Sequence, residues 1–426
     1  MSIHLKELVK GAGIALVLKV VGGAFMLVFG VAVTRSLGAK DSGIFFLALT
    51  IITIISIVGR FGLDNVIVKV TSNYSILNQW SALHVFYRKT IIIGIILSIS
   101  FSLLLWILAP ALANNVFNED ELAPILQILA FAITPLVVLN MHGQFLRGLK
   151  RISHSEIVLS FGMPAITLFI SFVALAWGIY GFAIAYVISA ATILILSILL
   201  WLYELPKDTS PTTQGQTQKE IFRSAAPFFV ATIMGMIIDR TSIIILGLTG
   251  TSSEVAIFEA ANRTTLVINF MLAAINSIAA PKFAALYMQH DMKNLKSTVR
   301  HGARILTMAA TPFLAILVLI PEKVMSIYGL DFVDGSTALM ILAIGQFFNA
   351  ATGSVGYLLM MTNNEKLLRN IVVVSALMHI IICIYAIPKY GVIGAAVATA
   401  ITMSLVNFVS TFFSWKKLNI LSIGFR

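Results

Sequence analysis

Charged side chains interrupt several stretches of this sequence that are otherwise apolar enough to cross a membrane. These residues are Lys19, Arg60, Asp64, Asp239, Arg240, Glu259 and Arg263. A charge at the centre of a bilayer costs about 2.5–3.5 kcal/mol, so such groups are expected to face a cavity or a partner and to mark a pathway. Basic residues outnumber acids in this set, and a cationic interior predicts a carrier for an anionic substrate.

Two acid–base pairs in this set have the spacing of one helical turn. Arg60 and Asp64 are four residues apart, as are Glu259 and Arg263. Each pair can therefore close within its own helix. Lys19 has no acid within one turn, so its ammonium group needs another helix or a ligand. The acids have two open interpretations, either as structural counterions or as groups that exchange H⁺ or Na⁺ during transport.

The remaining polar residues extend these two roles. Asp239 and Arg240 are adjacent and must point in different directions on a helix. Asn262, Asn269 and Asn276 recur every seven residues and form one polar stripe, suited either to sugar hydroxyls or to contacts between helices. The predicted substrate-binding residues are Lys19, Arg60, Arg240, Arg263, Asn262 and Asn269, and the predicted ion-coupling residues are Asp239, Glu259 and Asp64.

The composition is that of an integral membrane protein. Hydrophobic residues make up 59% of the chain and charged residues 11%, and the mean hydropathy is +0.97. The net charge of +11 lies in short segments between apolar runs, which indicates topology signals rather than a nucleic-acid surface. A single cysteine, Cys383, excludes an intramolecular disulfide and a multi-cysteine metal site. No bound cofactor is expected beyond a coupling ion.

An all-α membrane fold of about twelve spans follows from the hydropathy, because one span needs about 20 apolar residues. The predicted spans are 13–35, 43–68, 90–112, 122–146, 157–178, 181–203, 221–248, 254–280, 303–320, 335–361, 368–387 and 391–413. With the N-terminus in the cytoplasm, nearly all Lys and Arg outside the spans fall on the cytoplasmic side, so both termini are expected there. Residues 72–88 and 283–301 are expected to form amphipathic helices at that surface.

The chain is expected to divide into two halves of six spans. A polar stretch at 204–220 predicts a cytoplasmic linker between an N-lobe at 1–203 and a C-lobe at 221–426. Tyr180-Gly181 resembles Tyr390-Gly391 at an offset of 210, and 128–130 repeats as 341–343, Ile-Leu-Ala in both cases. An even number of spans per repeat orients both halves alike. Two parallel six-helix lobes are the design of an alternating-access transporter.

The first two spans carry a recognisable pattern. Residues 19–48, KVVGGAFMLVFGVAVTRSLGAKDSGIFFLA, contain an R-x-L-G-x-x-x-x-G turn at Arg35, Leu37, Gly38 and Gly43. Together with the length, the spans and the central linker, this stretch resembles the multidrug/oligosaccharidyl-lipid/polysaccharide (MOP) exporter superfamily. Within it, the chain looks most like the polysaccharide biosynthesis proteins of the Wzx-type O-antigen flippases.

That resemblance implies a function, a membrane and partners. It implies a flippase of the cell (inner) membrane that moves an undecaprenyl-pyrophosphate-linked oligosaccharide to the periplasmic leaflet, for O-antigen or capsule synthesis. Other polysaccharide-assembly proteins would then be its partners. A cation-coupled multidrug exporter of the same fold is the alternative, and it would be expected to use an acidic pocket. A membrane enzyme is third, but the outer gaps are too short for a catalytic loop.

Overall fold

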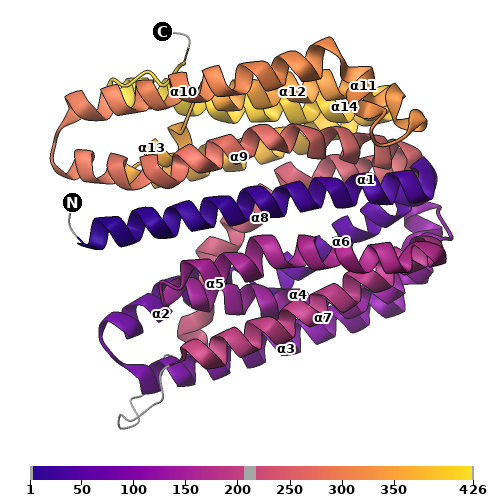
Figure 1. Ribbon diagram of the computed structural model, residues 1–426, viewed down its shortest axis with the longest axis horizontal. Coiled ribbons are helices and arrows are strands. Elements are labelled where there is room, and N and C mark those ends of the chain that lie inside the picture. Colours follow the sequence, from indigo (N-terminus) through magenta and orange to yellow (C-terminus); the bar gives the residue numbers. More distant parts are fainter. Residues whose placement is uncertain (1–2, 206–216, 425–426) are drawn as a thin grey trace. The chain divides into compact units, whose positions relative to one another are not determined.

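The computed structural model describes residues 3–205 and 217–424, and all the regular structure in those residues is helical (Figure 1). The first half contains α1 (Ile3–Gly59), α2 (Leu63–Ile76), α3 (Trp80–Ala111), the π-helix η1 (Leu112–Phe117), α4 (Leu122–Gly148), α5 (Ile152–Glu156), the π-helix η2 (Ile157–Phe161), α6 (Gly162–Ala174), the 3₁₀-helix η3 (Leu175–Trp177) and α7 (Gly178–Glu204). The second half contains α8 (Gln218–Thr249), α9 (Ser252–Met288), α10 (Met292–Leu319), α11 (Pro321–Met325), the 3₁₀-helix η4 (Leu330–Gly335), α12 (Ser336–Ala351), α13 (Val355–Met361) and α14 (Glu365–Leu418). Most of the predicted linker, 206–216, lies outside the described residues.

The helices confirm the predicted all-α membrane fold. Among the described residues, eight helical stretches are long and apolar enough to cross a bilayer. Three of these, at 13–59, 152–204 and 365–418, contain 47, 53 and 54 residues. At 1.5 Å per residue each is about 70–80 Å long, more than twice the apolar thickness of a membrane. Each long stretch therefore accommodates two of the predicted spans.

Glycines separate the two spans within each long stretch. Gly38 has φ 74° and ψ −177°, and Gly391 has φ 51° and ψ −127°. Gly178, at the start of α7, has φ 56° and ψ −142°. Side chains with a Cβ avoid this region, and glycine enters it at little steric cost. The apolar run can therefore turn at these residues without a polar loop.

The residues of the R-x-L-G-x-x-x-x-G pattern form and hold the kink at Gly38. Gly38 supplies the kink, while Arg35 donates from Nε to the carbonyl oxygen of Ile327 at 2.7 Å and from Nη2 to that of Ser326 at 3.2 Å. Gly43 lies so close to the backbone of Ser252 that a methyl group there would overlap its carbonyl. The pattern thus encodes a bend whose two sides are fixed to α9 and to the end of α11.

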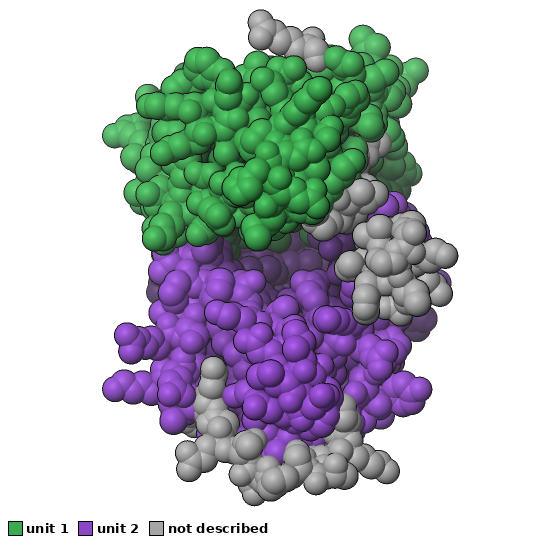
Figure 2. Space-filling view, turned by 90° about the vertical axis from the view of Figure 1, so that its left-hand side faces the viewer, with its two compact units in different colours: residues 1–12, 30–43, 234–426 green, residues 13–29, 44–233 purple. Residues whose placement is uncertain are grey.

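The described chain forms two compact units (Figure 2). Unit 1 contains residues 1–12, 30–43 and 234–426, and unit 2 contains residues 13–29 and 44–233. In unit 2, α4 packs against both α3 and α7. In unit 1, α12 packs against α9, α10 and α14. The spans built on α4 and α12 have the largest buried fraction of all the candidate spans, so each is the core helix of its unit.

The two halves of the chain repeat with an offset of 213 residues. Gly178 and Gly391 stand at the same kink with this separation. Lys150 and Asn363 are left-handed residues with the same separation, and α5 and α14 begin 213 residues apart. The Ile-Leu-Ala repeat at 128 and 341 has this offset, whereas the pairing of Gly181 with Gly391 at an offset of 210 is wrong by three residues. The kink glycines Gly178 and Gly391, rather than the Tyr-Gly pairs, therefore define how the two halves align.

Two further predictions about the helices are wrong in detail. The span predicted at 43–68 is broken, because α1 ends at Gly59 and α2 begins at Leu63. The segments 72–88 and 283–301 do not form separate amphipathic helices. They form the ends of α2 and α3, and of α9 and α10, joined by short turns at 77–79 and 289–291. Apolar spacing at the end of a long helix resembles that of a short surface helix.

Candidate functional site

A glycine in α1 brings Lys19 to a partner on another helix. Gly22 lies against the backbone of η2, and a methyl group at Gly22 would overlap the carbonyl oxygen of Ser160. Lys19 is about one turn before Gly22, and Glu156 is about one turn before Ser160. The close approach of α1 to η2 therefore aligns the two charges, and Lys19 Nζ lies 3.6 Å from Glu156 Oε1.

Glu156 is the centre of a buried charge cluster in unit 2. Its side chain is only 4% exposed. Arg147 Nη2 donates to Oε1 at 3.0 Å, and Ser160 Oγ donates to Oε2 at 2.6 Å. The carboxylate thus has a hydrogen-bonded partner on each oxygen before Lys19 is considered. Lys19 is 43% exposed and adds a cation that the buried carboxylate does not need for hydrogen bonding.

The backbone at this cluster is also unusual. Glu156 ends α5, and the next residues, Ile157–Phe161, form the π-helix η2. Short π-helical segments inserted in α-helices occur frequently at functional sites. A second buried acid, Glu204 at the end of α7, contacts Arg151 at 2.7 Å and His154 Nδ1 at 2.9 Å. Glu156 thus lies at the C-terminal end of α5, whereas Glu204 contacts Arg151, which precedes the helix, and His154 within it.

The Arg60–Asp64 pair forms at the break between α1 and α2. Arg60 Nη1 lies 3.0 Å from Asp64 Oδ2. Phe61 and Gly62, between them, have φ values of 45° and 70°, and a positive φ is a genuine outlier for a residue as bulky as Phe61. Phe61 is held by a stacked contact with Phe229 of α8, the ring centroids being 4.6 Å apart. The pair therefore lies at a fixed, strained turn.

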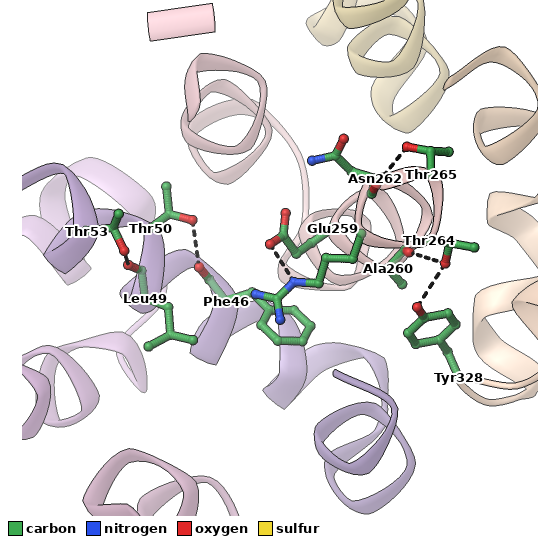
Figure 3. Close-up of polar contacts among 11 residues, drawn as sticks. Phe46, Leu49, Thr50, Thr53, Glu259, Ala260, Asn262, Thr264, Thr265 and Tyr328 are labelled. Atoms are coloured by element: carbon green, nitrogen blue, oxygen red, sulfur yellow. Dashed lines mark hydrogen bonds and ion pairs between the residues drawn. The ribbon is translucent and has the colours of Figure 1, made fainter. Parts of the chain in front are cut away.

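The Glu259–Arg263 pair lies on the unbroken helix α9 of unit 1. Arg263 Nε donates to Glu259 Oε1 at 2.7 Å, and the two side chains are 7% and 4% exposed. Glu259 Oε2 is buried without a hydrogen-bond partner among the described residues. One residue beyond Arg263, the Thr264 hydroxyl lies 2.9 Å from the hydroxyl of Tyr328. Figure 3 shows this contact between the two labelled side chains. A small residue of α1, Gly30, leaves room beside the guanidinium.

The predicted asparagine stripe contacts a neighbouring helix through one member. Asn349 of α12 donates its amide to Asn269 Oδ1 at 3.2 Å and to Gln346 Oε1 at 3.3 Å. Gln346 Nε2 is itself buried without a partner among the described residues. The amide group of Asn262, one turn after Glu259 on α9, is labelled in Figure 3 and is half-buried. The Asn269–Asn349 contact joins α9 to α12, and Gln346 Nε2 has no hydrogen-bond partner among the described residues.

Asp239 and Arg240 do not join these clusters. Both lie on α8 in unit 1, Asp239 exposed and Arg240 half-buried. The structure thus brings together Lys19 with Glu156, Arg60 with Asp64, and Glu259 with Arg263.

Glu156 is the residue that the sequence does not reveal. It stands one position before the predicted span 157–178 and is therefore counted with the polar connection. No nearby spacing links it to Lys19, which is more than 130 residues away. The available signal is that Lys19 lacks an acid within its own helix and so requires one elsewhere.

Comparison with known proteins gives the family. A family model described as "Polysaccharide biosynthesis protein" matches residues 32–337. The chain is 23% identical over 388 residues to the probable low-salt glycan biosynthesis flippase Agl15 of Haloferax volcanii, covering 90% of this chain and 79% of that protein.

Solved structures give the fold. The inward closed lipid II flippase MurJ aligns with a TM-score of 0.73 and 15% identity, over 93% of this chain and 87% of that chain. An inward-facing MATE family multidrug resistance transporter of the MOP superfamily aligns with a TM-score of 0.71 and 16% identity, over 96% and 98%. Since the family model spans well over half of its length, the chain belongs to the polysaccharide biosynthesis protein family, and it has the fold of the MOP-superfamily transporters.

Proposed function

We propose that this protein is a flippase that moves an undecaprenyl-pyrophosphate-linked oligosaccharide across the cell membrane by alternating access, for the synthesis of a surface polysaccharide such as O-antigen or capsule. Its family and its relative, named as a probable glycan biosynthesis flippase, support this class of function. The basic residues within its spans support an anionic carrier group as the part of the substrate that the protein holds.

The observation that carries the proposal is the state of Lys19. Its ammonium group is 43% exposed and lies near a carboxylate that already accepts hydrogen bonds from Arg147 and Ser160. Lys19 can therefore leave Glu156 for a phosphate without stranding the acid. Hydrogen bonds between an ammonium and a phosphate are about twice as strong as neutral ones. In this proposal Glu156 holds Lys19 in place until the pyrophosphate replaces it.

Other basic and polar residues have supporting roles in the proposal. Arg60, Arg240 and Arg263 supply further positive charge along the path, and the amides of Asn262 and Asn269 hydrogen-bond to sugar hydroxyls. A coupling ion, H⁺ or Na⁺, would bind at the acids of the spans. Glu259 and Asp64 each have a buried oxygen without a partner among the described residues, which supports the choice of these two. Exposed Asp239 is the third.

The proposal includes an orientation. Both termini and the 204–220 linker lie in the cytoplasm, because this places most of the Lys and Arg residues of the connections on that side. The two halves then act as the moving lobes of the transporter, at 1–203 and 221–426.

A multidrug exporter remains the alternative with this fold. Such a protein would be expected to offer an acid to a cationic drug. The buried acids Glu156 and Glu259 instead lie against Lys19, Arg147 and Arg263. Each is a poor site for a cationic drug unless its basic partner moves away, so the geometry favours an anionic substrate.

The test is a deletion of the gene in its own host, complemented with variants. Lys19→Gln is expected to lower surface polysaccharide by about tenfold or more, since one charge-assisted hydrogen bond contributes about 1.5–3 kcal/mol. Lipid-linked oligosaccharide should accumulate on the cytoplasmic side of the membrane. Lys19→Arg, which keeps the charge, should retain part of the activity.

The matched control is Lys69→Gln, which removes an exposed lysine of α2 in the same unit. It should complement fully. Full complementation by Lys19→Gln at equal protein level would show that this cation does not hold the carrier. Unchanged polysaccharide in the deletion strain, together with increased drug sensitivity, would favour the exporter instead.

A further inference from the structure

Helix α10 begins with a row of basic residues on one face. Lys293, Lys296, Arg300 and Arg304 follow a spacing of three to four residues, so their side chains lie on the same side of the helix. The opposite face, formed by Leu295, Val299, Ala303 and Leu306, is buried. The basic residues, together with Ser297 and His301, line a cavity of about 440 Å³. The packed face fixes the direction of the basic one.

A second cavity of about 680 Å³ adjoins the first, and the two share Ser297 and His301 in their linings. It lies between α9 and α10, and its lining is mainly apolar, with Ile275, Leu286 and Ile305 among its residues. None of the described residues that line the two cavities is acidic. The combined site therefore has a cationic part and an apolar part in contact with each other.

His301 is oriented to serve the shared region. Its Nδ1 lies 2.7 Å from the carbonyl oxygen of Ser297. A carbonyl can only accept, so Nδ1 carries the hydrogen, and in the neutral ring this assignment leaves Nε2 to accept a hydrogen bond from a ligand. The ring can thus add a further polar contact beside the basic row.

The position of the site indicates the source of its ligand. One and two turns beyond His301 on the same face, Ile305 and Met308 are exposed on a helix that is apolar enough to span a membrane. Large exposed apolar side chains on such a helix face lipid. The apolar cavity is therefore accessible to bilayer lipids, and the row of cations lies at the end of the span, where headgroups are found.

We propose that this site binds an anionic phospholipid of the surrounding bilayer. The headgroup phosphate would contact Lys296 and Arg300, a headgroup hydroxyl would donate to His301 Nε2, and an acyl chain would occupy the groove beside Ile275 and Ile305. Basic pockets between spanning helices bind anionic lipid headgroups in this way. The row from Lys293 to Arg304 extends along about 16 Å of helix axis, which exceeds a single phosphate and suits a phospholipid headgroup region. A soluble anion would leave the apolar groove unused.

The test measures lipid binding to purified protein in detergent, by native mass spectrometry, and does not depend on transport. Phosphatidylglycerol is compared with zwitterionic phosphatidylethanolamine and with undecaprenyl phosphate. The first variant, Lys296→Gln with Arg300→Gln, removes two cations. The second, Gly302→Leu, fills the groove, where an added Cβ would meet only Ile275 at 3.9 Å. The control, Lys416→Gln with Lys417→Gln, removes two exposed cations at the end of α14 in the same unit.

Wild-type protein is expected to bind phosphatidylglycerol more tightly than phosphatidylethanolamine. The double glutamine variant should bind it about thirtyfold more weakly, because each cation near an anionic surface contributes about a fivefold factor. Gly302→Leu should also weaken binding, and the control should not. Equal binding of the two phospholipids, or an equal loss in the control, would overturn the proposal. A preference for undecaprenyl phosphate over phosphatidylglycerol would likewise overturn it, and would assign the site to the carrier lipid.

Discussion

The second predicted span of each half carries an acid–base pair, and the two pairs lie in different structures. In the first half, Arg60 and Asp64 flank the break between α1 and α2, and their side chains are 14% and 21% exposed. In the second half, Glu259 and Arg263 lie within the continuous helix α9 and are 4% and 7% exposed. The same four-residue spacing therefore produces one pair at a turn and one pair in a helical core.

The difference lies in what else stabilises each acid. Asp64 is in the first turn of α2, where the N-terminal end of the helix dipole favours a negative charge by about 0.3–1 kcal/mol. Each acid has one oxygen with no partner among the described residues, but Glu259 begins the third turn of α9, beyond the turn that the helix terminus stabilises. Glu259 thus depends on Arg263, whereas Asp64 has support of its own. The four-residue spacing indicates that an ion pair can form. The surroundings of the acid determine how much stability is lost when its basic partner is removed.

The largest expected effect is at the buried pair. Arg263→Gln leaves the Glu259 carboxylate buried without its cation, which costs about 3–5 kcal/mol, so little protein should reach the membrane. Replacing Glu259 by Gln in the same molecule removes the stranded charge and should restore much of the abundance. Thermal unfolding in detergent and membrane protein level are the measurements. If the single and double variants are equally abundant, the pair does not stabilise α9.

The next largest effect is expected at the break that distinguishes the two helices. Gly62 has φ 70°, and a Cβ there would meet the backbone of Ala225 and Phe229. Gly62→Ala should therefore destabilise the protein by about 2 kcal/mol or more, since the left-handed conformation alone costs about 1–2 kcal/mol. Gly235 of α8 is the control, because nothing lies within 4 Å of an added Cβ. Gly235→Ala should be neutral or stabilising by up to about 1 kcal/mol.

How much of the fold and of the candidate site can be predicted from the sequence depends on the kind of interaction that forms each part. The spans are predictable because burial in lipid requires long apolar runs. Lys19 is identified as a functional candidate because a charge inside such a run violates that requirement. The break at Phe61 is not predictable, since the stretch Gly-Arg-Phe-Gly at 59–62 has no distinctive hydropathy and the geometry of the break is imposed by the contact with α8. Glu156 was missed for the same reason: only the approach of Gly22 to η2 places it beside Lys19.

A smaller effect is expected at the partly exposed pair. Arg60→Gln should cost about 1 kcal/mol or less, because water and the α2 terminus continue to stabilise Asp64. Membrane protein level should stay near that of the wild type, in contrast to Arg263→Gln. Surface polysaccharide should nevertheless fall if Arg60 contributes charge to the path. A loss of protein as severe as that of Arg263→Gln would mean that the two pairs do not differ in the way their exposure indicates.

The smallest effect concerns the helices that follow these pairs. Asp291 accepts a hydrogen bond from the backbone N–H of Asn294 at 3.0 Å at the start of α10, whereas the corresponding helix α3 has no side-chain cap. Hydrogen bonds from the backbone and side chain of Asn294 lower the pKa of Asp291 below its ordinary value of 3.8. A lowered pKa in the folded state means that the ionised carboxylate contributes stability above pH 4, and that this contribution is lost as the pH falls through the folded pKa. Asp291→Asn keeps a capping oxygen and removes the charge. Its melting temperature should therefore be slightly below that of the wild type at pH 7 and should converge with it toward pH 3. A difference that is constant with pH would show that the cap acts through its shape and not through its charge.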